Sequence, residues 1–132
     1  YDIVIRRSPL RTRQPDLFFF SAQQLAQNPH LLDEPRTEIA PELVIEVLSP
    51  SDSVSVWRDK LHDYHQIGVR EVWAVDLQNE EIEVLVWEAW GYRTIGWFKG
   101  ENPITSQVLS GLELKPQTLF SATPTPPAPE GA

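Results

Sequence analysis

The chain has 132 residues, 41% of them hydrophobic, and carries five Trp and five Phe. This length and apolar content suit one compact domain and exclude a disordered chain. The sequence has no Cys, which excludes disulfides, thiolate metal sites and a Cys nucleophile, so any metal must be held by oxygen or imidazole. No apolar run of about 18 residues and no signal peptide is visible, so we expect a cytoplasmic protein with no membrane partner.

The charge balance limits the partners of the protein. It has 11 Lys and Arg residues against 19 Asp and Glu residues, a net charge of −8. This excess opposes charge-driven attraction to nucleic acid, so a nucleic-acid role needs a local basic patch. The candidate patch comprises Arg6, Arg7, Arg11 and Arg13.

The first half of the chain alternates short apolar runs with turn residues. Residues 1–6 alternate apolar and polar side chains like an edge strand, and residues 16–20 predict a second strand. Residues 21–27 predict a short helix capped by its first residue, Ser21, and a loop follows over residues 30–40. Residues 42–48 are apolar enough for a core strand that is covered on both faces.

The second half begins with a helix and continues with strands. The helix starts at Asp52 or Ser53 and stops at Gly68, and its apolar residues recur every three or four positions. Residues 71–76, 82–87 and 92–97 predict antiparallel strands separated by turns. Because a strand, a helix and a strand follow one another over residues 42–76, we expect one parallel crossover unit. The sequence therefore predicts an α/β fold with a mixed sheet flanked by helices and an antiparallel, strand-rich C-terminal half.

The domain boundaries follow from composition. Residues 1–121 are expected to form one domain whose N-terminus is truncated, because the chain opens directly on a strand pattern. Residues 122–132 contain many Pro and little apolar mass, so they predict a disordered Pro-rich tail.

One carboxylate stands where the strand pattern requires an aliphatic residue. Glu46 interrupts the core strand, and an ionised carboxylate there loses several kcal/mol of hydration unless a cation or hydrogen bonds replace it. Asp16 begins another strand, and a neighbouring strand would bring the two acids within about 5 Å. Lys60 follows on the predicted helix. We therefore expect two carboxylates and one ammonium group to converge.

Such a group of side chains is suited to a hard divalent ion. Mg²⁺ or Mn²⁺ commonly takes one or two carboxylates plus water and substrate phosphate. Asp16 and Glu46 are the candidate metal ligands, and the main-chain carbonyl near Val47 is a further oxygen. Lys60 is the candidate for orienting the attacking water or stabilising charge on phosphorus, the chemistry of a phosphodiesterase.

Each of these residues also has a plainer interpretation. Asp16 after a Pro is typical of a turn cap, Glu46 could form a structural ion pair with an Arg, and most helical Lys residues only extend to the surface. Two His residues three apart on the helix, His62 and His65, have no third ligand at zincin-like spacing and are interpreted as surface residues.

Two further features each have two interpretations, and a third residue lies outside the site. Ser49 and Ser51 either close a turn or contact phosphate. The Trp-rich strands from Trp73 to Trp97 are core or dimer contacts unless they stack on bases. Glu42 shares a strand face with the candidate acid Glu46 but lies roughly 13 Å away along the strand, too far to bind the same ion.

Several segments together resemble a known family. They are Pro15-Asp16, Glu46–Ser51, Lys60–Tyr64, Gly68–Asp76, Gly91-Tyr92 and Leu109–Leu114. They look like the Uma-type restriction endonuclease family of the PD-(D/E)XK nuclease superfamily, which implies a restriction-endonuclease-like fold. In that superfamily the first Asp and the acid of the (D/E)XK element bind metal, which here implies Asp16 and Glu46. The Lys normally stands two positions after the acid, where this chain has Leu48, so the resemblance implies that Lys60 takes that role.

The resemblance implies a Mg²⁺- or Mn²⁺-dependent endonuclease that hydrolyses DNA phosphodiester bonds, with Asp16, Glu46 and Lys60 as catalytic residues. An alternative is a catalytically inactive nuclease-fold domain that serves as a binding or oligomerisation module, favoured by Leu48 and by the net charge of −8. A regulator that binds another chain through its Pro-rich tail is a third hypothesis. A homodimer would suit double-strand cleavage, because a two-fold axis relates two sites to two antiparallel strands.

Overall fold

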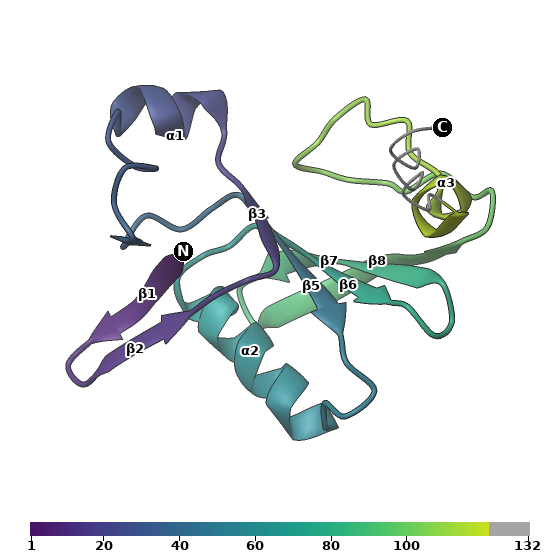
Figure 1. Ribbon diagram of the computed structural model, residues 1–132, viewed down its shortest axis with the longest axis horizontal. Coiled ribbons are helices and arrows are strands. Elements are labelled where there is room, and N and C mark those ends of the chain that lie inside the picture. The colour runs from purple at the N-terminus through teal and green to yellow at the C-terminus, as the bar shows by residue number, and fades with distance from the viewer. Residues whose placement is uncertain (122–132) are drawn as a thin grey trace, which may run out of the picture.

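The computed structural model describes residues 1–121 (Figure 1). Its strands are β1 (Asp2–Arg7), β2 (Leu10–Arg13), β3 (Leu17–Phe19), β4 (Arg36–Thr37), β5 (Leu43–Leu48), β6 (Glu71–Asp76), β7 (Glu81–Glu88) and β8 (Gly91–Lys99). Its helices are α1 (Ala22–Gln27), α2 (Val54–Gln66) and α3 (Pro116–Ser121). None of these described helices is long and apolar enough to span a membrane. The predicted tail over residues 122–132 lies outside the described residues.

The main sheet has five strands in the order β3-β5-β6-β7-β8. β5 and β6 pair in parallel and α2 connects them, which confirms the predicted crossover unit. The pairs β6-β7 and β7-β8 are antiparallel, as predicted for the second half, and β3 also pairs with β5 in antiparallel fashion. The predicted class, a mixed sheet flanked by helices, is confirmed.

Helix starts follow the sequence signals. Ser53 is the N-cap of α2, and its hydroxyl accepts a hydrogen bond from the N–H of Val56 at 3.2 Å. Ser21 caps α1 in the same way and forms a reciprocal capping box with Gln24. Each cap satisfies main-chain donors that have no partner inside the helix.

The five-stranded sheet has a core on each face. One face packs against α2 through a cluster that contains Val44, Tyr64, Val72 and Ala74. The other face carries a cluster with Leu43 and Trp73, covered by residues 104–114 and by α3. Figure 1 shows α2 and α3 on opposite sides of the sheet. The central strands are therefore buried on both faces, and a side chain of β5 faces α2 or the C-terminal segment according to its position.

The N-terminal strands form a separate sheet in the order β2-β1-β4. β1 is its central strand, so the prediction of an edge strand over residues 1–6 is wrong. The missing neighbour is β4, two residues within the predicted loop that pair in parallel with Asp2 and Ile3. Its sequence carries no strand pattern because so short a segment is ordered by its partner.

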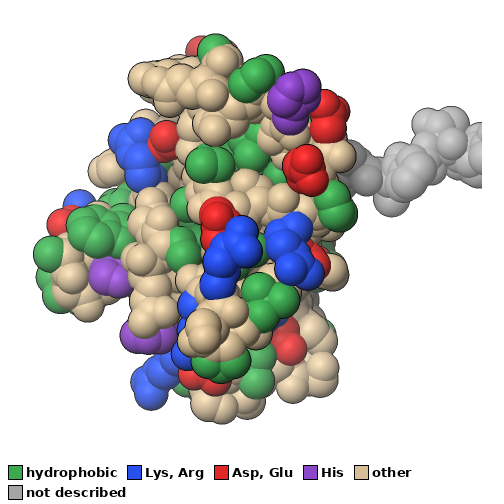
Figure 2. All heavy atoms as spheres, turned by 90° about the vertical axis from the view of Figure 1, so that its left-hand side faces the viewer, with side chains coloured by type: hydrophobic (Ala, Val, Ile, Leu, Met, Phe, Trp, Pro, Cys, Tyr) green, Lys and Arg blue, Asp and Glu red, His purple; other side chains and the backbone are tan. Residues whose placement is uncertain are grey.

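Three of the four Arg residues of the predicted basic patch form ion pairs. Arg11 and Arg13 both bind the Asp63 carboxylate of α2, at 2.9 and 2.6 Å, and Arg7 pairs with Glu38. Burial raises the pKa of Asp63, but the hydrogen bonds from the two Arg outweigh it and hold that pKa below its usual value. In Figure 2, basic side chains lie beside acidic ones across this side of the molecule. Two carboxylates therefore neutralise about half of the charge of the four Arg residues, and Arg11 and Arg13 attach the small sheet to α2.

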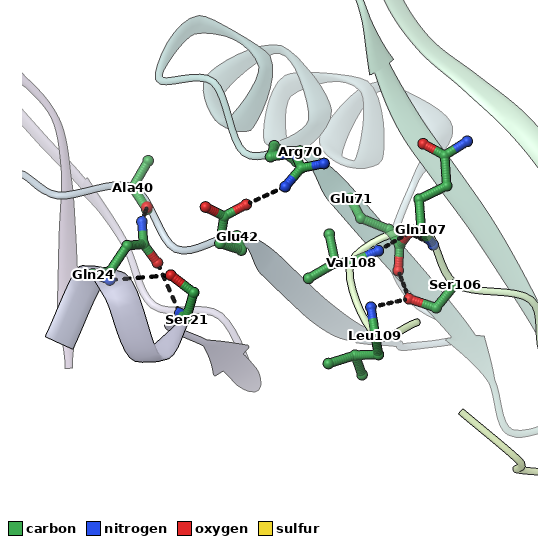
Figure 3. A network of polar contacts seen from close by, with 10 residues as sticks. All are labelled: Ser21, Gln24, Ala40, Glu42, Arg70, Glu71, Ser106, Gln107, Val108 and Leu109. Atoms are coloured by element: carbon green, nitrogen blue, oxygen red, sulfur yellow. Dashed lines mark hydrogen bonds and ion pairs between the residues drawn. The ribbon is translucent and has the colours of Figure 1, made fainter. Parts of the chain in front are cut away.

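A second buried acid, Glu71, joins β6 to the C-terminal segment. Glu71 is fully buried. Its carboxylate accepts hydrogen bonds from the indole N–H of Trp73, the hydroxyl of Ser106 and the main-chain N–H groups of Gln107 and Val108 (Figure 3). Nothing in the sequence marks Glu71 as buried, because an acid at the start of a strand is ordinarily solvated.

Substitution Glu71→Ala is expected to lower the free energy of unfolding by about 3 kcal/mol, because it leaves several buried donors without an acceptor. Urea denaturation followed by circular dichroism measures this loss. Glu113→Ala removes an exposed acid from the same segment and is the matched control, with an expected change below about 0.5 kcal/mol. Equal midpoints for the two variants would contradict the assignment of Glu71 as a structural anchor.

Candidate functional site

Asp16 and Glu46 lie opposite each other on neighbouring strands. In the antiparallel pair of β3 and β5, Leu17 stands across from Ile45 and Phe18 across from Val44. Extending this register by one residue places Asp16 across from Glu46. The two acids come from segments 30 residues apart in sequence, and the sheet brings them together at the point where β3 begins.

Glu46 is held against α2. It is only 3% exposed, and its Oε1 accepts a hydrogen bond from the hydroxyl of Tyr64. Its Oε2 forms an ion pair with Lys60 Nζ at 3.8 Å, longer than a hydrogen bond. The alternative interpretation, a structural ion pair with an Arg, is therefore wrong: the partners of Glu46 are a Tyr and a Lys from one face of α2.

The surroundings of Glu46 oppose its ionisation. Burial is the largest influence and raises the pKa of the carboxyl above its ordinary value of 4.5. The hydrogen bond from Tyr64 and the charge of Lys60 act in the opposite direction, whereas the negative charge of Asp16 raises the pKa further. A cation between the two carboxylates would relieve both the desolvation and the repulsion.

Tyr64 acts as a fixed hydrogen-bond donor to the site. Burial raises the pKa of Tyr64, and its contact with Glu46 adds to this shift, so the hydroxyl keeps its proton. From its sequence position, Tyr64 is expected only as one of the apolar residues that recur along the helix. A signal was present, because Tyr64 follows Lys60 by four residues and side chains at that spacing share one helix face.

Asp16 is exposed and contacts the main chain of β5. Its Oδ2 accepts a hydrogen bond from the N–H of Val47 at 2.7 Å. The interpretation of Asp16 as a cap of its own turn is thus replaced by a bond across two strands. The N–H and C=O groups of a strand residue project to the same side, so the carbonyl of Val47 is also directed toward Asp16.

These residues supply part of the set of oxygen ligands that a hard divalent ion needs. Within residues 1–121, no three Asp, Glu, His or Cys side chains gather into a complete metal-binding group. The chain therefore offers two carboxylates, Asp16 and Glu46, and the main-chain oxygen of Val47. That is the kind of incomplete set that Mg²⁺ completes with water and substrate phosphate.

The other candidate residues lie outside this group. Ser49 and Ser51 are hydrogen-bonded to each other at 2.8 Å in the turn after β5. His62 is exposed, and His65 stacks on Trp87 with ring centroids 4.9 Å apart. Glu42 binds Arg70 at 3.0 Å, as Figure 3 shows. These contacts favour structural roles for Ser49, Ser51, His65 and Glu42, whereas His62 is a surface residue, as predicted.

Comparison with known proteins agrees with this geometry. Residues 2–117 match the Uma2 family, whose description is "Putative restriction endonuclease". That match supports nuclease function in general. No curated protein matches the chain.

A solved structure illustrates the similarity in fold. It is a putative nuclease belonging to DUF820 from Anabaena variabilis ATCC 29413, with a TM-score of 0.64 and 22% sequence identity. The match covers 83% of this chain and 60% of that one, so this chain spans only part of the neighbour's length. At this sequence identity the similarity shows a shared fold only. Because the family match extends over residues 2–117, this chain belongs to the Uma2 family.

Proposed function

We propose that this protein is an endonuclease that uses Mg²⁺ or Mn²⁺ to hydrolyse DNA phosphodiester bonds. The observation that carries the proposal is the buried carboxylate of Glu46, which lies beside a second acid and an ammonium group. A structural acid is normally saturated by hydrogen bonds. Glu46 instead has one hydroxyl donor, a long ion pair and a like-charged neighbour.

Asp16, Glu46 and the carbonyl of Val47 would hold the metal. When bound, such an ion supplies a Lewis acid that polarises a phosphoryl oxygen and lowers the pKa of water. Tyr64 orients Glu46, in the way that outer residues orient metal ligands elsewhere. Lys60 carries the positive charge closest to the carboxylates, so it is suited to orient the attacking water or to stabilise charge on the phosphoryl oxygens.

Lys60 provides an ammonium group near Glu46, although no Lys stands two residues after that acid. Leu48 occupies that strand position and packs against the α2 core. Lys60 approaches the same carboxylate from α2, so an ammonium group is present although its place in the sequence differs. A cytoplasmic location and a homodimer stay predictions of the sequence.

Substitution Glu46→Gln is expected to abolish binding of one Mn²⁺ ion in a calorimetric titration, because a neutral amide is a weak ligand for a hard cation. The metal-free variant should melt at no lower temperature than the natural protein, since burial already disfavours the charge of Glu46. Glu42→Gln, on the same strand face but paired with Arg70, is the control and should leave Mn²⁺ binding unchanged. Undiminished binding by Glu46→Gln would contradict the proposed metal ligand.

Substitution Tyr64→Phe is expected to weaken Mn²⁺ binding about tenfold, as loss of an outer partner of a metal ligand does. It also removes an interaction that lowers the pKa of Glu46. Metal binding needs the ionised carboxylate, so affinity should fall as the pH decreases through that pKa, and in the variant this fall should occur at a higher pH. Calorimetry across a pH series measures both effects.

Tyr92→Phe is the matched control for Tyr64→Phe. Its hydroxyl is partly buried and donates to the carbonyl of Val69 at 2.6 Å, away from the acids. The pH profile of this control should match that of the natural protein. Identical profiles for Tyr64→Phe and Tyr92→Phe would contradict the role given to Tyr64.

Nicking of supercoiled plasmid with added Mn²⁺ tests the function itself. Cleavage by the natural protein should be lost in Asp16→Asn, and Lys60→Met should reduce its rate about 100-fold, as removal of one charge-stabilising group does. Lys115→Met, at an exposed position before α3, is the control and should keep full activity. If the natural protein binds Mn²⁺ and never cleaves DNA, the inactive binding module is favoured instead.

A further inference from the structure

Trp97 of β8 is an exposed aromatic residue on the same side of the main sheet as Glu46. Its exposed fraction is 62% although it lies within a nine-residue strand. It stands directly across from Glu83 of β7. So large an aromatic surface in water is a candidate contact for a ligand.

A β-bulge determines where Trp97 points. The β7-β8 register shifts between Val84 and Leu85, which inserts Ile95 as an extra residue. Thr94 pairs with Leu85 on the α2 face, whereas Ile95 packs in the core on the opposite face. In a regular strand Trp97 would share the face of Ile95, and the bulge turns it to the α2 face.

Gly96 fits this irregular strand. A Cβ atom there would stand 2.7 Å from the ring of Phe98. Close packing at Gly96 therefore supports the bulge that re-aims Trp97. Bulges are frequent next to functional sites for this reason.

The sheet register connects Trp97 to the proposed metal site. Glu46 pairs with Ala74, Ala74 with Glu83, and Glu83 with Trp97. These four residues form one row across the sheet, roughly 14 Å long at the usual strand spacing. Because the side chain of Ala74 is small, the row has a hollow in it.

That hollow has a volume of about 120 Å³ and is lined by Leu48, Ala74, Asp76, Glu81, Glu83 and Trp97. Its carboxylates are partly engaged already. Asp76 accepts hydrogen bonds from the turn at Gln78 and Asn79, and Glu81 stands opposite Lys99. Glu83 accepts one from the hydroxyl of Thr94 at 2.6 Å and keeps a further oxygen for a ligand.

An exposed indole beside a carboxylate acceptor matches the chemistry of an unpaired base. Aromatic side chains stack on bases of single strands, and carboxylates accept hydrogen bonds from exocyclic amino groups such as N4 of cytosine. A base within a duplex offers no free face for such stacking. Thymine has no exocyclic amino group to donate to Glu83.

We propose that Trp97 and Glu83 form a subsite for one unpaired, amino-bearing base, such as cytosine, of the DNA strand that crosses the sheet. This inference rests on the proposed nuclease function and adds a substrate preference to it. Trp97 supplies the stacking surface, and Glu83 distinguishes cytosine from thymine.

Fluorescence anisotropy with labelled oligo-dC and oligo-dT of equal length, in calcium buffer, tests the subsite. The natural protein should bind oligo-dC about tenfold more tightly than oligo-dT. Trp97→Ala should weaken oligo-dC binding about tenfold. Trp90→Ala is the matched control, since Trp90 is 73% exposed at the β7-β8 turn and should change binding less than about twofold.

Glu83→Gln tests the preference separately. Its amide still accepts from cytosine but also donates to O4 of thymine, so the ratio of the two affinities should approach one. Equal binding by Trp97→Ala and Trp90→Ala, no preference of the natural protein for oligo-dC, or tighter binding of oligolysine than of either oligonucleotide would overturn the subsite.

Plasmid nicking with Mn²⁺ on the same preparations separates the two proposals. Cleavage by the natural protein together with equal oligonucleotide binding by Trp97→Ala and Trp90→Ala overturns the subsite and leaves the nuclease function standing. The expected oligonucleotide results without any cleavage support the subsite and contradict the nuclease function.

Discussion

The burial of an ionisable carboxylate in the central strand β5 is the constraint on which the rest of the site depends. Glu46 faces α2 within an otherwise apolar layer, where its charge loses the hydration it has in water. Tyr64 and Lys60 compensate for this loss from one face of α2. The crossover helix therefore serves two purposes: it completes the core of the sheet, and it supplies the groups that make the buried acid tolerable.

Two buried acids of the same sheet have different roles because their hydrogen-bond partners differ. Glu71 accepts bonds from two side chains and two main-chain N–H groups, so its carboxylate is saturated and anchors the C-terminal segment. Glu46 accepts one hydroxyl bond and lies near Asp16, whose charge raises its pKa. A saturated acid stabilises the fold, whereas an incompletely compensated one gains from binding a cation.

The arginines near the N-terminus illustrate how far local sequence can mislead. Arg11 and Arg13 lie close together in sequence and suggest a basic surface for nucleic acid. In the fold they bind Asp63, which lies 50 residues or more further along the chain. What remains for nucleic-acid contact is therefore less charged than the sequence suggests. This is consistent with a proposed mode of recognition through stacking and a metal ion more than through a broad positive surface.

The sequence by itself determined the elements around the site and the candidate acid, but not the short elements β2, β4 and α3. The apolar periodicity gave β5, α2 and β6 with their parallel connection, and Glu46 stood out because it broke that pattern. Only the tertiary structure decided that Asp16 stands opposite Glu46, that Tyr64 binds it and that β4 pairs with β1. The physical reason is range: periodicity and capping act between neighbours in sequence, whereas strand register and contacts between an acid and its partners form only when distant segments pack together.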